Sequence, residues 1–327
     1  MPKQHGSARP HVPVMVEEVL HHLDPQSGET IVEACCGYDG HGQHIRAGLT
    51  KGTYIGIDWD SEAIAYCQRG PRTEEEPRAI WIKGNFASLK DLLAQRSIAS
   101  VDRVFFDLGV SSPMLEDEER GIAIKFPEAP LDFRMTDQVS ETAADYLNRV
   151  SQGELAKVLL HCGEERHAHR IARALVRARR EKPFRVMRDF TSVIHRVAGK
   201  AKIHGRDTAT RSAMAIRIRI HGELDNLERG LEAAIELLNP GGRAVLLSYH
   251  SLEDAIVKRT FRKLSGVCVC PGRLPECRCG AARLGQILTR KPVRPSEQEV
   301  AHNVRSRSAR LRAFLKGTEN ELGQMRN

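Results

Sequence analysis

The feature that most restricts the fold of this chain is an alternation of strand-like and helix-like segments between residues 30 and 110. Strand and helix patterns alternate at 30–37, 42–49, 53–60, 61–68, 79–86, 88–95 and 101–110. Such alternation is typical of a parallel sheet covered by helices on both faces. Ser61 is the candidate N-cap of the helix at 61–68. The sequence therefore predicts an α/β, Rossmann-like domain.

The same alternation resumes near residue 222. A helix is predicted over 223–238, a strand over 243–251 and another helix over 252–264. The segment 307–317 is expected to form a last edge strand. The residues between the two alternating regions are mostly helical instead. We therefore predict a first part of the α/β domain (1–112), a helical substrate-recognition insertion (113–210) and a second part of the α/β domain (211–327).

Positive charge is concentrated in one stretch of the predicted insertion. The chain has a net charge of +8 and a pI of about 9.2, and an excess of positive charge favours polyanionic partners. Between Arg166 and Arg188 there are nine basic residues and one acid. At helical spacing, one face carries Arg166, Arg170, Arg173, Arg177 and Arg180, and another carries Ile171, Leu175 and Ala178. We expect this arginine face to meet an anionic partner; the alternative is an ordinary solvated surface.

The sequence also limits where the protein can act. No apolar run approaches the roughly 20 residues of a membrane span, and the first residues lack the apolar stretch of a secretion signal. We therefore expect a cytoplasmic protein with no membrane partner. The sequence leaves the oligomeric state open between monomer and homodimer.

A glycine-containing turn follows the first predicted strand, in "IVEACCGYDGHGQHI" (residues 31–45). Gly37, Gly40 and Gly42 lie where a ligand would approach the backbone closely, although their spacing differs from G-x-G-x-x-G. Asp58 ends the second strand, where a carboxylate can accept hydrogen bonds from ribose hydroxyls. The alternative role for Asp58 is an acid beside a helix N-terminus. A dinucleotide or S-adenosylmethionine would satisfy both features.

Two further strand ends carry candidate ligand contacts. Phe86 follows the third strand and lies either against an adenine ring or in the core. Asp107 ends the fourth strand, at the edge where open α/β sheets bind ligands, or else it caps the next turn.

Several longer blocks occur in a recognisable order: "HVPVMVEEVL", "FFDLGVSSP", "PLDFRM", "TATR", "LNPGGR", "YHSLEDAIVKR", "CVCPGRLPECRCG" and "LTRKPVRPSEQEV". With them, the sequence resembles the bacterial small-subunit (16S) ribosomal RNA N4-cytosine methyltransferase family from about His11 to Arg312. The resemblance implies a class I methyltransferase fold with a helical insertion. It also implies S-adenosylmethionine as the methyl donor and a cytidine of small-subunit ribosomal RNA, free or in a ribosomal particle, as the substrate.

The resemblance assigns most of the donor contacts, to which the turn adds Gly37. By position in the family motifs they are Asp39, Gly40, His41, Asp58, Phe86, Asp107 and Met114. Two positions depart from the family pattern, since Asp39 replaces a glycine and Met114 a glutamine. Asp is one of the few residues that tolerate a positive φ. The Asp39 side chain would either crowd the methyl donor or contact the amino group of the methyl donor.

Other departures affect the substrate side. Asp207-Thr208 replaces a histidine-proline pair, Ala213-Met214 a phenylalanine-glutamine pair, and His221 an asparagine. These changes motivate two alternatives: a catalytically impaired relative that acts as an RNA- or ribosome-binding assembly factor, or a paralogue with a different target base. An NAD-dependent oxidoreductase is disfavoured because the G-x-G-x-x-G order is missing.

Methylation of a cytosine amine needs positioning and an acceptor for the amine protons. Asp107 is the candidate acceptor, and the base must be held outside its stack. Asp132, Arg134, His250 and Glu253 are further candidate catalytic residues, in predicted loops at the ligand edge of the sheet. The alternative for "SLED" is a capping box between Ser251 and Asp254.

Four of the eight cysteines lie together in one loop, as Cys268, Cys270, Cys277 and Cys279. Four thiolates can form a closed zinc site, but C-x-C is less usual than C-x-x-C, so the sequence alone assigns no metal. The other cysteines, Cys35, Cys36, Cys67 and Cys162, are expected to be packing residues.

Overall fold

The computed structural model describes residues 12–70, 77–199, 202–203, 206–272 and 276–318. The chain divides into two compact units, of which the first combines Met1–Gly109 with Leu224–Asn327 and the second is Val110–Glu223. Among the described residues, no helix is long and apolar enough to cross a membrane.

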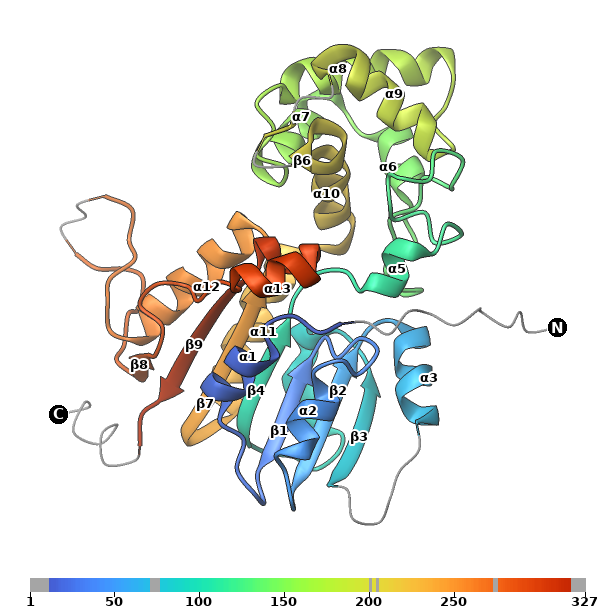
Figure 1. Cartoon of the computed structure of the whole chain (residues 1–327). Coiled ribbons are helices and arrows are strands. Elements are labelled where there is room, and N and C mark those ends of the chain that lie inside the picture. The colour runs from blue at the N-terminus through green and yellow to red at the C-terminus, as the bar shows by residue number, and fades with distance from the viewer. Residues whose placement is uncertain (1–11, 71–76, 200–201, 204–205, 273–275, 319–327) are drawn as a thin grey trace. The chain divides into compact units, whose positions relative to one another are not determined.

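The first unit is built on a seven-stranded sheet of order β3-β2-β1-β4-β7-β9-β8 (Figure 1). The strands are β1 (Thr30–Ala34), β2 (Thr53–Asp58), β3 (Arg78–Lys83), β4 (Val101–Asp107), β7 (Leu238–Ser248), β8 (Gly285–Ile287) and β9 (Arg310–Lys316). The first four strands and β7 pair in parallel. The strand order reverses between β1 and β4, and ligands of open α/β sheets bind at the carboxyl ends of strands at such a point. The expected α/β class is confirmed.

The expected edge position of the last strand is wrong. β9 lies inside the sheet, antiparallel to both β7 and β8, and the three-residue β8 forms the edge. Leu311, Ala313 and Phe314 are all fully buried. Apolar residues on both faces of the strand are what an interior position requires.

Helices cover both faces of this sheet. The helices of this unit are α1 (Val16–Leu23), α2 (Gly42–Ala47), α3 (Ser61–Arg69), η1 (Phe86–Ser88), α4 (Leu89–Ala94), α11 (Glu223–Leu237, beginning at the last residue of the second unit), α12 (Ser251–Leu264), α13 (Glu297–His302) and η2 (Val304–Ser308). Successive residues of a strand point to opposite faces. Accordingly, Phe105 packs in a core with residues of α1, α2 and α3, and Phe106 in a second core with residues of α4, α11 and α12.

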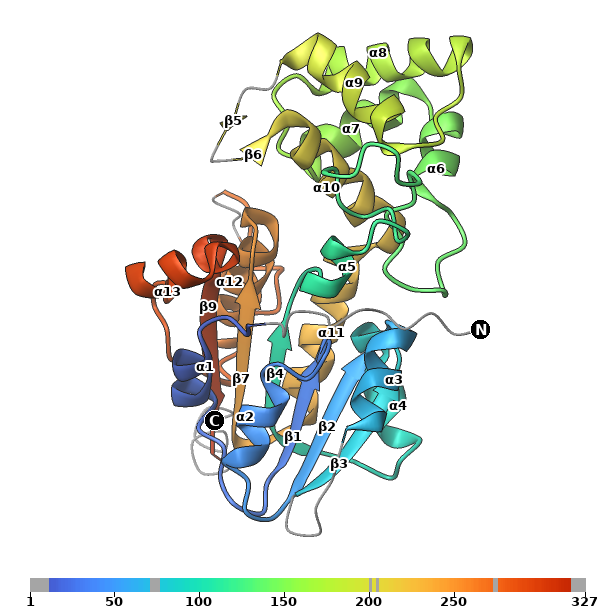
Figure 2. The ribbon, with the colours of Figure 1, turned by 45° about the vertical axis from the view of Figure 1, so that its right-hand side comes forward.

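The second unit is mostly helical (Figure 2), and its buried apolar residues form a core of their own. It contains α5 (Ser112–Glu116), α6 (Ala143–Arg149), α7 (Gln152–His161), α8 (Ala168–Glu181), α9 (Met187–Ala198), α10 (Thr208–His221) and the two-residue strands β5 (Lys202–Ile203) and β6 (Arg206–Asp207). The unit runs past residue 210, where the sequence analysis ended the insertion. The reason is that α10 contacts α6, α7 and α9 and buries Ile216 in their core.

Candidate functional site

The turn after β1 has an unusual backbone. Cys35, Gly37 and Asp39 all have positive φ, at 74°, 50° and 66°. A Cβ atom built on Gly37 would meet no atom within 4 Å. The turn therefore leaves open space beside Gly37, as a close approach of a ligand requires.

The charge of Asp39 is compensated inside the protein. Arg46 of α2 donates two hydrogen bonds of 2.7 Å, one to each carboxylate oxygen of Asp39. The Arg46 guanidinium also lies over the rings of Tyr54 and Trp81, at 5.0 and 5.5 Å from their centroids. The aspartate thus adopts the positive φ expected of a glycine position, and its carboxylate is held by α2.

Asp58 connects the end of β2 to this turn. Its Oδ2 accepts a hydrogen bond of 2.8 Å from Gly37 N, and its Oδ1 accepts one of 2.8 Å from Asp60 N. Burial raises the pKa of Asp58 to about 6, against the opposing effect of these backbone amides. The expected N-cap of α3 is wrong, because Asp60 rather than Ser61 accepts the hydrogen bond from Glu62 N. Asp58 is therefore a rigidly held acceptor at the strand end.

Phe86 lies at the end of the neighbouring strand and is half-buried. Its ring packs edge-on against Phe106, with 5.6 Å between centroids. A Cβ atom on Gly230 of α11 would collide with the Phe86 ring, at 2.4 Å. The ring is thus partly in the core and partly accessible.

Asp107 is the centre of a buried network at the end of β4. Its Oδ1 accepts a hydrogen bond of 2.8 Å from the Tyr249 hydroxyl, and its Oδ2 lies 3.3 Å from His41 Nδ1. The other ring nitrogen of His41 lies 2.8 Å from the carbonyl oxygen of Val14. Because both nitrogens face oxygen acceptors, the His41 ring carries two N–H groups and a positive charge.

Electrostatics agree with this protonation state. Burial by itself would lower the pKa of His41, but the charge and hydrogen bond of Asp107, the charge of Glu33 and the Val14 carbonyl outweigh it and raise the pKa to about 9. Glu33 of β1 is fully buried and accepts a hydrogen bond of 2.6 Å from the Tyr54 hydroxyl. Burial raises the pKa of Glu33 to about 8.

His250 and Glu253 hold the turn that carries Tyr249. Glu253 Oε2 accepts hydrogen bonds from Tyr249 N at 2.8 Å and from His250 N at 3.2 Å. His250 Nδ1 accepts a hydrogen bond of 3.4 Å from Glu253 N, and its Nε2 lies 3.1 Å from Glu253 Oε1. The alternative for "SLED", a capping box between Ser251 and Asp254, is wrong by one residue, since the box joins His250 and Glu253.

Three candidate residues belong to the second unit. Arg134 pairs with Asp132 through two hydrogen bonds, of 2.7 and 2.8 Å. His221 Nε2 accepts a hydrogen bond of 3.0 Å from Met135 N, which fixes the end of the "PLDFRM" loop. Met114 is buried in α5. The departure at Asp207 also has a local role, because its side chain caps α10 by accepting a hydrogen bond of 2.8 Å from Thr210 N.

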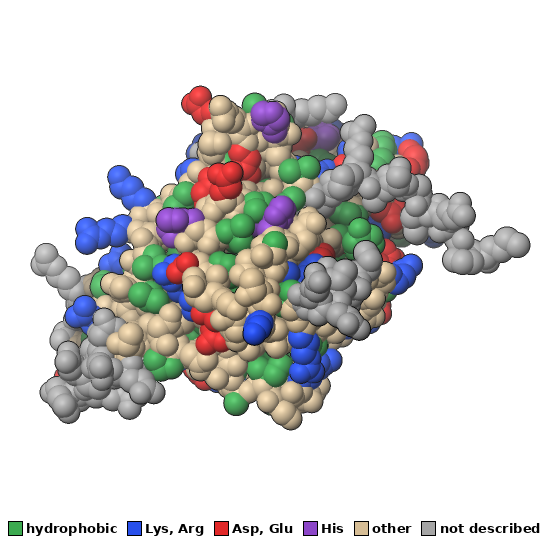
Figure 3. All heavy atoms as spheres, turned by 60° about the horizontal axis from the view of Figure 1, so that its bottom comes forward, with side chains coloured by type: hydrophobic (Ala, Val, Ile, Leu, Met, Phe, Trp, Pro, Cys, Tyr) green, Lys and Arg blue, Asp and Glu red, His purple; other side chains and the backbone are tan. Residues whose placement is uncertain are grey.

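The predicted arginine face lies on α8, except for Arg166, which precedes that helix by two residues. Its members Arg166, Arg170, Arg173, Arg177 and Arg180 are all at least partly exposed, and Ile171 and Leu175 are buried. Within the described part of the chain, none of these five arginines forms an ion pair. In the view of Figure 3, basic side chains occur singly or in small groups, in places beside acidic ones.

Comparison with known proteins identifies the family. The model of the "MraW methylase family" matches residues 8–317. The chain belongs to this family. It is 40% identical over 313 residues to a Syntrophobacter fumaroxidans protein named "Ribosomal RNA small subunit methyltransferase H", covering 95% of this chain and 98% of that protein. A Geobacter sulfurreducens protein of the same name is 42% identical over 311 residues, covering 94% and 98%.

Two similar solved structures are more distant in sequence. An rRNA methylase from Streptococcus thermophilus is 10% identical, with a TM-score of 0.40 over 93% of this chain and 94% of that one. A putative methyltransferase from Streptococcus mutans in complex with SAH is 10% identical, with a TM-score of 0.41 over 94% and 98%.

Sequence reasoning missed two residues in this MraW methylase family member. Tyr249 begins the block "YHSLEDAIVKR", and its place at the end of a predicted strand could have marked it as a neighbour of Asp107. Arg46, the partner of Asp39, lies within the next helix and carries no sequence signal of that role.

Proposed function

We propose that the protein is an S-adenosylmethionine-dependent methyltransferase that methylates the N4 amine of a cytidine in small-subunit ribosomal RNA. Membership of the MraW methylase family over residues 8–317 carries this proposal. The network at the carboxyl ends of β1, β2 and β4 gives it a physical basis. A ribosomal RNA substrate also implies action in the cytoplasm.

The donor would lie against the turn after β1. The space beside Gly37 fits the close approach of a ligand, and Asp39, Gly40 and His41 follow in the same turn. The Asp58 carboxylate accepts backbone hydrogen bonds from Gly37, Trp59 and Asp60, and its two oxygens have further lone pairs for ribose hydroxyls. The accessible part of Phe86 suits an adenine ring. Met114, at the position where the family has a glutamine, is a candidate donor contact on the resemblance alone.

Asp107 would accept a proton of the target amine. S-adenosylmethionine, when bound, supplies an electrophilic methyl group on a sulfonium. A carboxylate that accepts an amine N–H increases electron density on that nitrogen, whose lone pair is otherwise delocalised into the ring. Tyr249 and His41 fix both oxygens of Asp107, so the carboxylate needs no reorientation when the amine arrives.

The remaining candidates would position the machinery or the substrate. His250 and Glu253 hold the backbone of Tyr249, and we assign them a positioning role. The Asp132–Arg134 pair presents a fixed guanidinium suited to a phosphate or base edge. The arginine face of α8 would bind the phosphates of the RNA around the target, in the free RNA or in a ribosomal particle.

The first test is calorimetric titration of the purified protein with S-adenosylmethionine. We expect saturable binding that Asp58→Ala weakens by about 10- to 100-fold, because hydrogen bonds to a charged acceptor contribute about 1.5–3 kcal/mol. Glu62→Ala, which removes an exposed acid of α3, is the matched control and should bind normally. Asp58→Asn, with a melting curve for each variant, separates loss of binding from loss of folding.

The second test identifies the modified base. Nucleosides of ribosomal RNA from a deletion strain should lack N4-methylcytidine in mass spectrometry. Loss of a different mark would establish a paralogue with another target base. Unchanged nucleosides, with no donor binding but intact RNA binding, would establish an RNA-binding assembly factor instead.

A further inference from the structure

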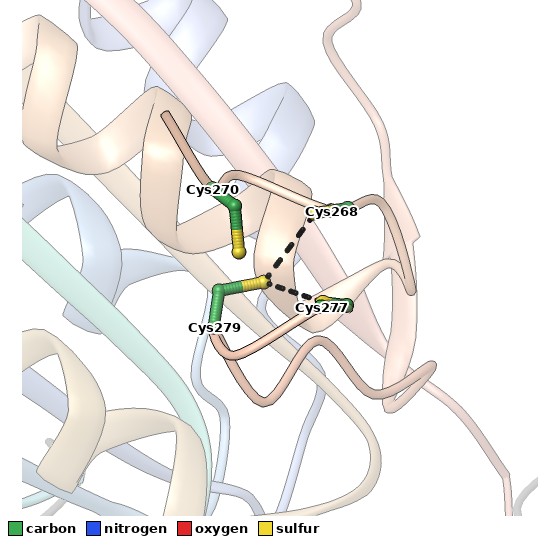
Figure 4. Close-up of side chains that lie close together, drawn as sticks. All are labelled: Cys268, Cys270, Cys277 and Cys279. Atoms are coloured by element: carbon green, nitrogen blue, oxygen red, sulfur yellow. Dashed lines mark hydrogen bonds between the residues drawn. The ribbon is translucent and has the colours of Figure 1, made fainter. Parts of the chain in front are cut away.

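Four thiols converge in the segment that joins α12 to β8 (Figure 4). The sulfur atoms of Cys268, Cys270, Cys277 and Cys279 all lie within 4.8 Å of one another. Cys279 Sγ is 3.3 Å from Cys277 Sγ and 3.9 Å from Cys268 Sγ. Two C-x-C pairs from separate stretches of the segment thus point toward one centre.

These sulfur–sulfur distances fit four ligands of one metal ion better than they fit sulfur atoms joined in a disulfide. Four thiolates about 2.3 Å from a tetrahedral zinc ion lie roughly 3.8 Å from one another. A disulfide would require about 2.05 Å, and all four cysteines are free. Sulfur atoms that lie within 4.8 Å of one another can surround a single ion but are too close together to hold a multinuclear cluster.

The segment has no apolar core to explain the convergence. Of its described residues, 266–272 and 276–283, none is buried. Its base is closed by backbone hydrogen bonds, including 2.7 Å from Leu284 N to Leu264 O and 3.1 Å from Ala282 N to Lys263 O. Beyond this base, burial cannot supply the free energy that orders the chain, and small coreless segments commonly rely on a metal or a covalent cross-link.

Backbone amides support the sulfurs as acceptors. Val269 N donates to Cys279 Sγ at 3.4 Å, and Arg278 N donates to Cys270 Sγ at 3.3 Å. Such outer hydrogen bonds orient metal ligands and favour the thiolate form.

We propose that Cys268, Cys270, Cys277 and Cys279 bind one Zn²⁺ as a closed structural site. Binding replaces the thiol protons, which pass to solvent, and involves no change of oxidation state. Four protein ligands leave no open coordination position, so the ion stabilises the segment and takes no part in methyl transfer. The proposal is independent of the proposed function.

The test measures metal in the full-length protein, purified under reducing conditions without chelator. Mass-spectrometric metal analysis should find about one zinc per chain. A variant with all four cysteines changed to serine should contain none, and Cys162→Ser, which removes a cysteine outside the cluster, should keep it. Reconstitution with Co²⁺ should give the visible absorption bands of a tetrahedral cobalt thiolate, which the quadruple variant should not show.

A second readout follows the order of the segment. Stripping the metal with a mercurial reagent and chelator should accelerate tryptic cleavage after Arg278 by roughly tenfold or more, since local opening governs such cleavage. The wild-type measurements do not depend on whether the quadruple variant folds. A metal-free wild type with four reactive thiols, bound iron, a disulfide within the cluster, or zinc retained by the quadruple variant would each overturn the proposal.

Discussion

The charged groups of the network around Asp107 and those of the arginine face of α8 differ in burial and in pairing. In the network the charged groups are largely buried, and Asp107, His41 and Asp58 each have partners at defined distances. On α8 the arginines reach solvent and form no ion pairs among the described residues. Buried charge persists only when it is paired, whereas exposed charge remains hydrated.

The difference separates two kinds of recognition. A network of fixed donors and acceptors suits one small ligand and one reacting amine, because its groups need little reorganisation. Hydrated arginines suit a polyanion, because counterion release drives binding without demanding one orientation. We therefore expect single changes to have large effects in the network and small, salt-dependent effects on α8.

The largest effect is expected for Asp107→Asn. This change keeps the shape of the side chain but removes the charge that faces His41 and the acceptor proposed for the amine. Methyl transfer to small-subunit RNA, measured in single turnovers, should fall by about 10³-fold, as when a key electrostatic group is removed from an active site.

Tyr249→Phe is the matched control for this variant, because it removes one hydrogen bond to Asp107 and leaves the carboxylate in place. It should slow transfer by only about tenfold. If Asp107→Asn kept a transfer rate close to that of the wild type, the proposed role of Asp107 would be wrong.

The next largest effect is a fall in stability at alkaline pH. The folded pKa of His41 is about 9, above its unfolded value of 6.5. A raised pKa stabilises the fold fully below the unfolded pKa, and this contribution disappears as the pH rises through the folded pKa. Between pH 6.5 and 9, His41 should therefore account for a fall on the order of 3 kcal/mol in the free energy of unfolding.

Urea denaturation of the wild type and His41→Gln at several pH values checks this prediction. The fall should be smaller in the variant, with a remainder that reflects the other buried groups of the network, Glu33 among them. Arg173→Gln should show the wild-type profile, because Arg173 is exposed and outside the network. Stability that is flat or rises over this range would contradict the assigned charge of His41.

Local sequence patterns predicted most elements of the sheet unit but not its last strand. Strands β1 to β4 follow from the spacing of apolar residues and from the turn residues between segments, which are local properties of the sequence. The insertion of β9 between β7 and β8 is a choice of pairing partner, which local periodicity does not encode. The pairing of β9 with both β7 and β8, seen in the structure, reveals its interior position.

The site shows the same limit at the level of single atoms. The strand-end positions of Asp58 and Asp107 were predictable, because the carboxyl ends of parallel strands meet at one edge. Their partners were not, since the contacts of Asp39 with Arg46 and of Asp107 with Tyr249 depend on tertiary packing. At α3 and α12 the caps were misplaced by one residue, because adjacent polar residues compete for the same role and the backbone conformation decides.

The smallest effect per residue is expected on α8. The double variant Arg173→Gln/Arg177→Gln should weaken binding to small-subunit RNA. It should also reduce the slope of log K against log salt by about 0.7 for each single-strand phosphate that the protein no longer neutralises. Affinity for S-adenosylmethionine should not change, because it depends on the residues at the carboxyl ends of the strands.

Arg149→Gln is the matched control, since Arg149 is also exposed on the second unit but is paired with Glu141. Parallel salt dependences for the double variant and the wild type would show that the arginine face does not contact RNA phosphates, and reduced donor affinity would show that the two regions do not act separately.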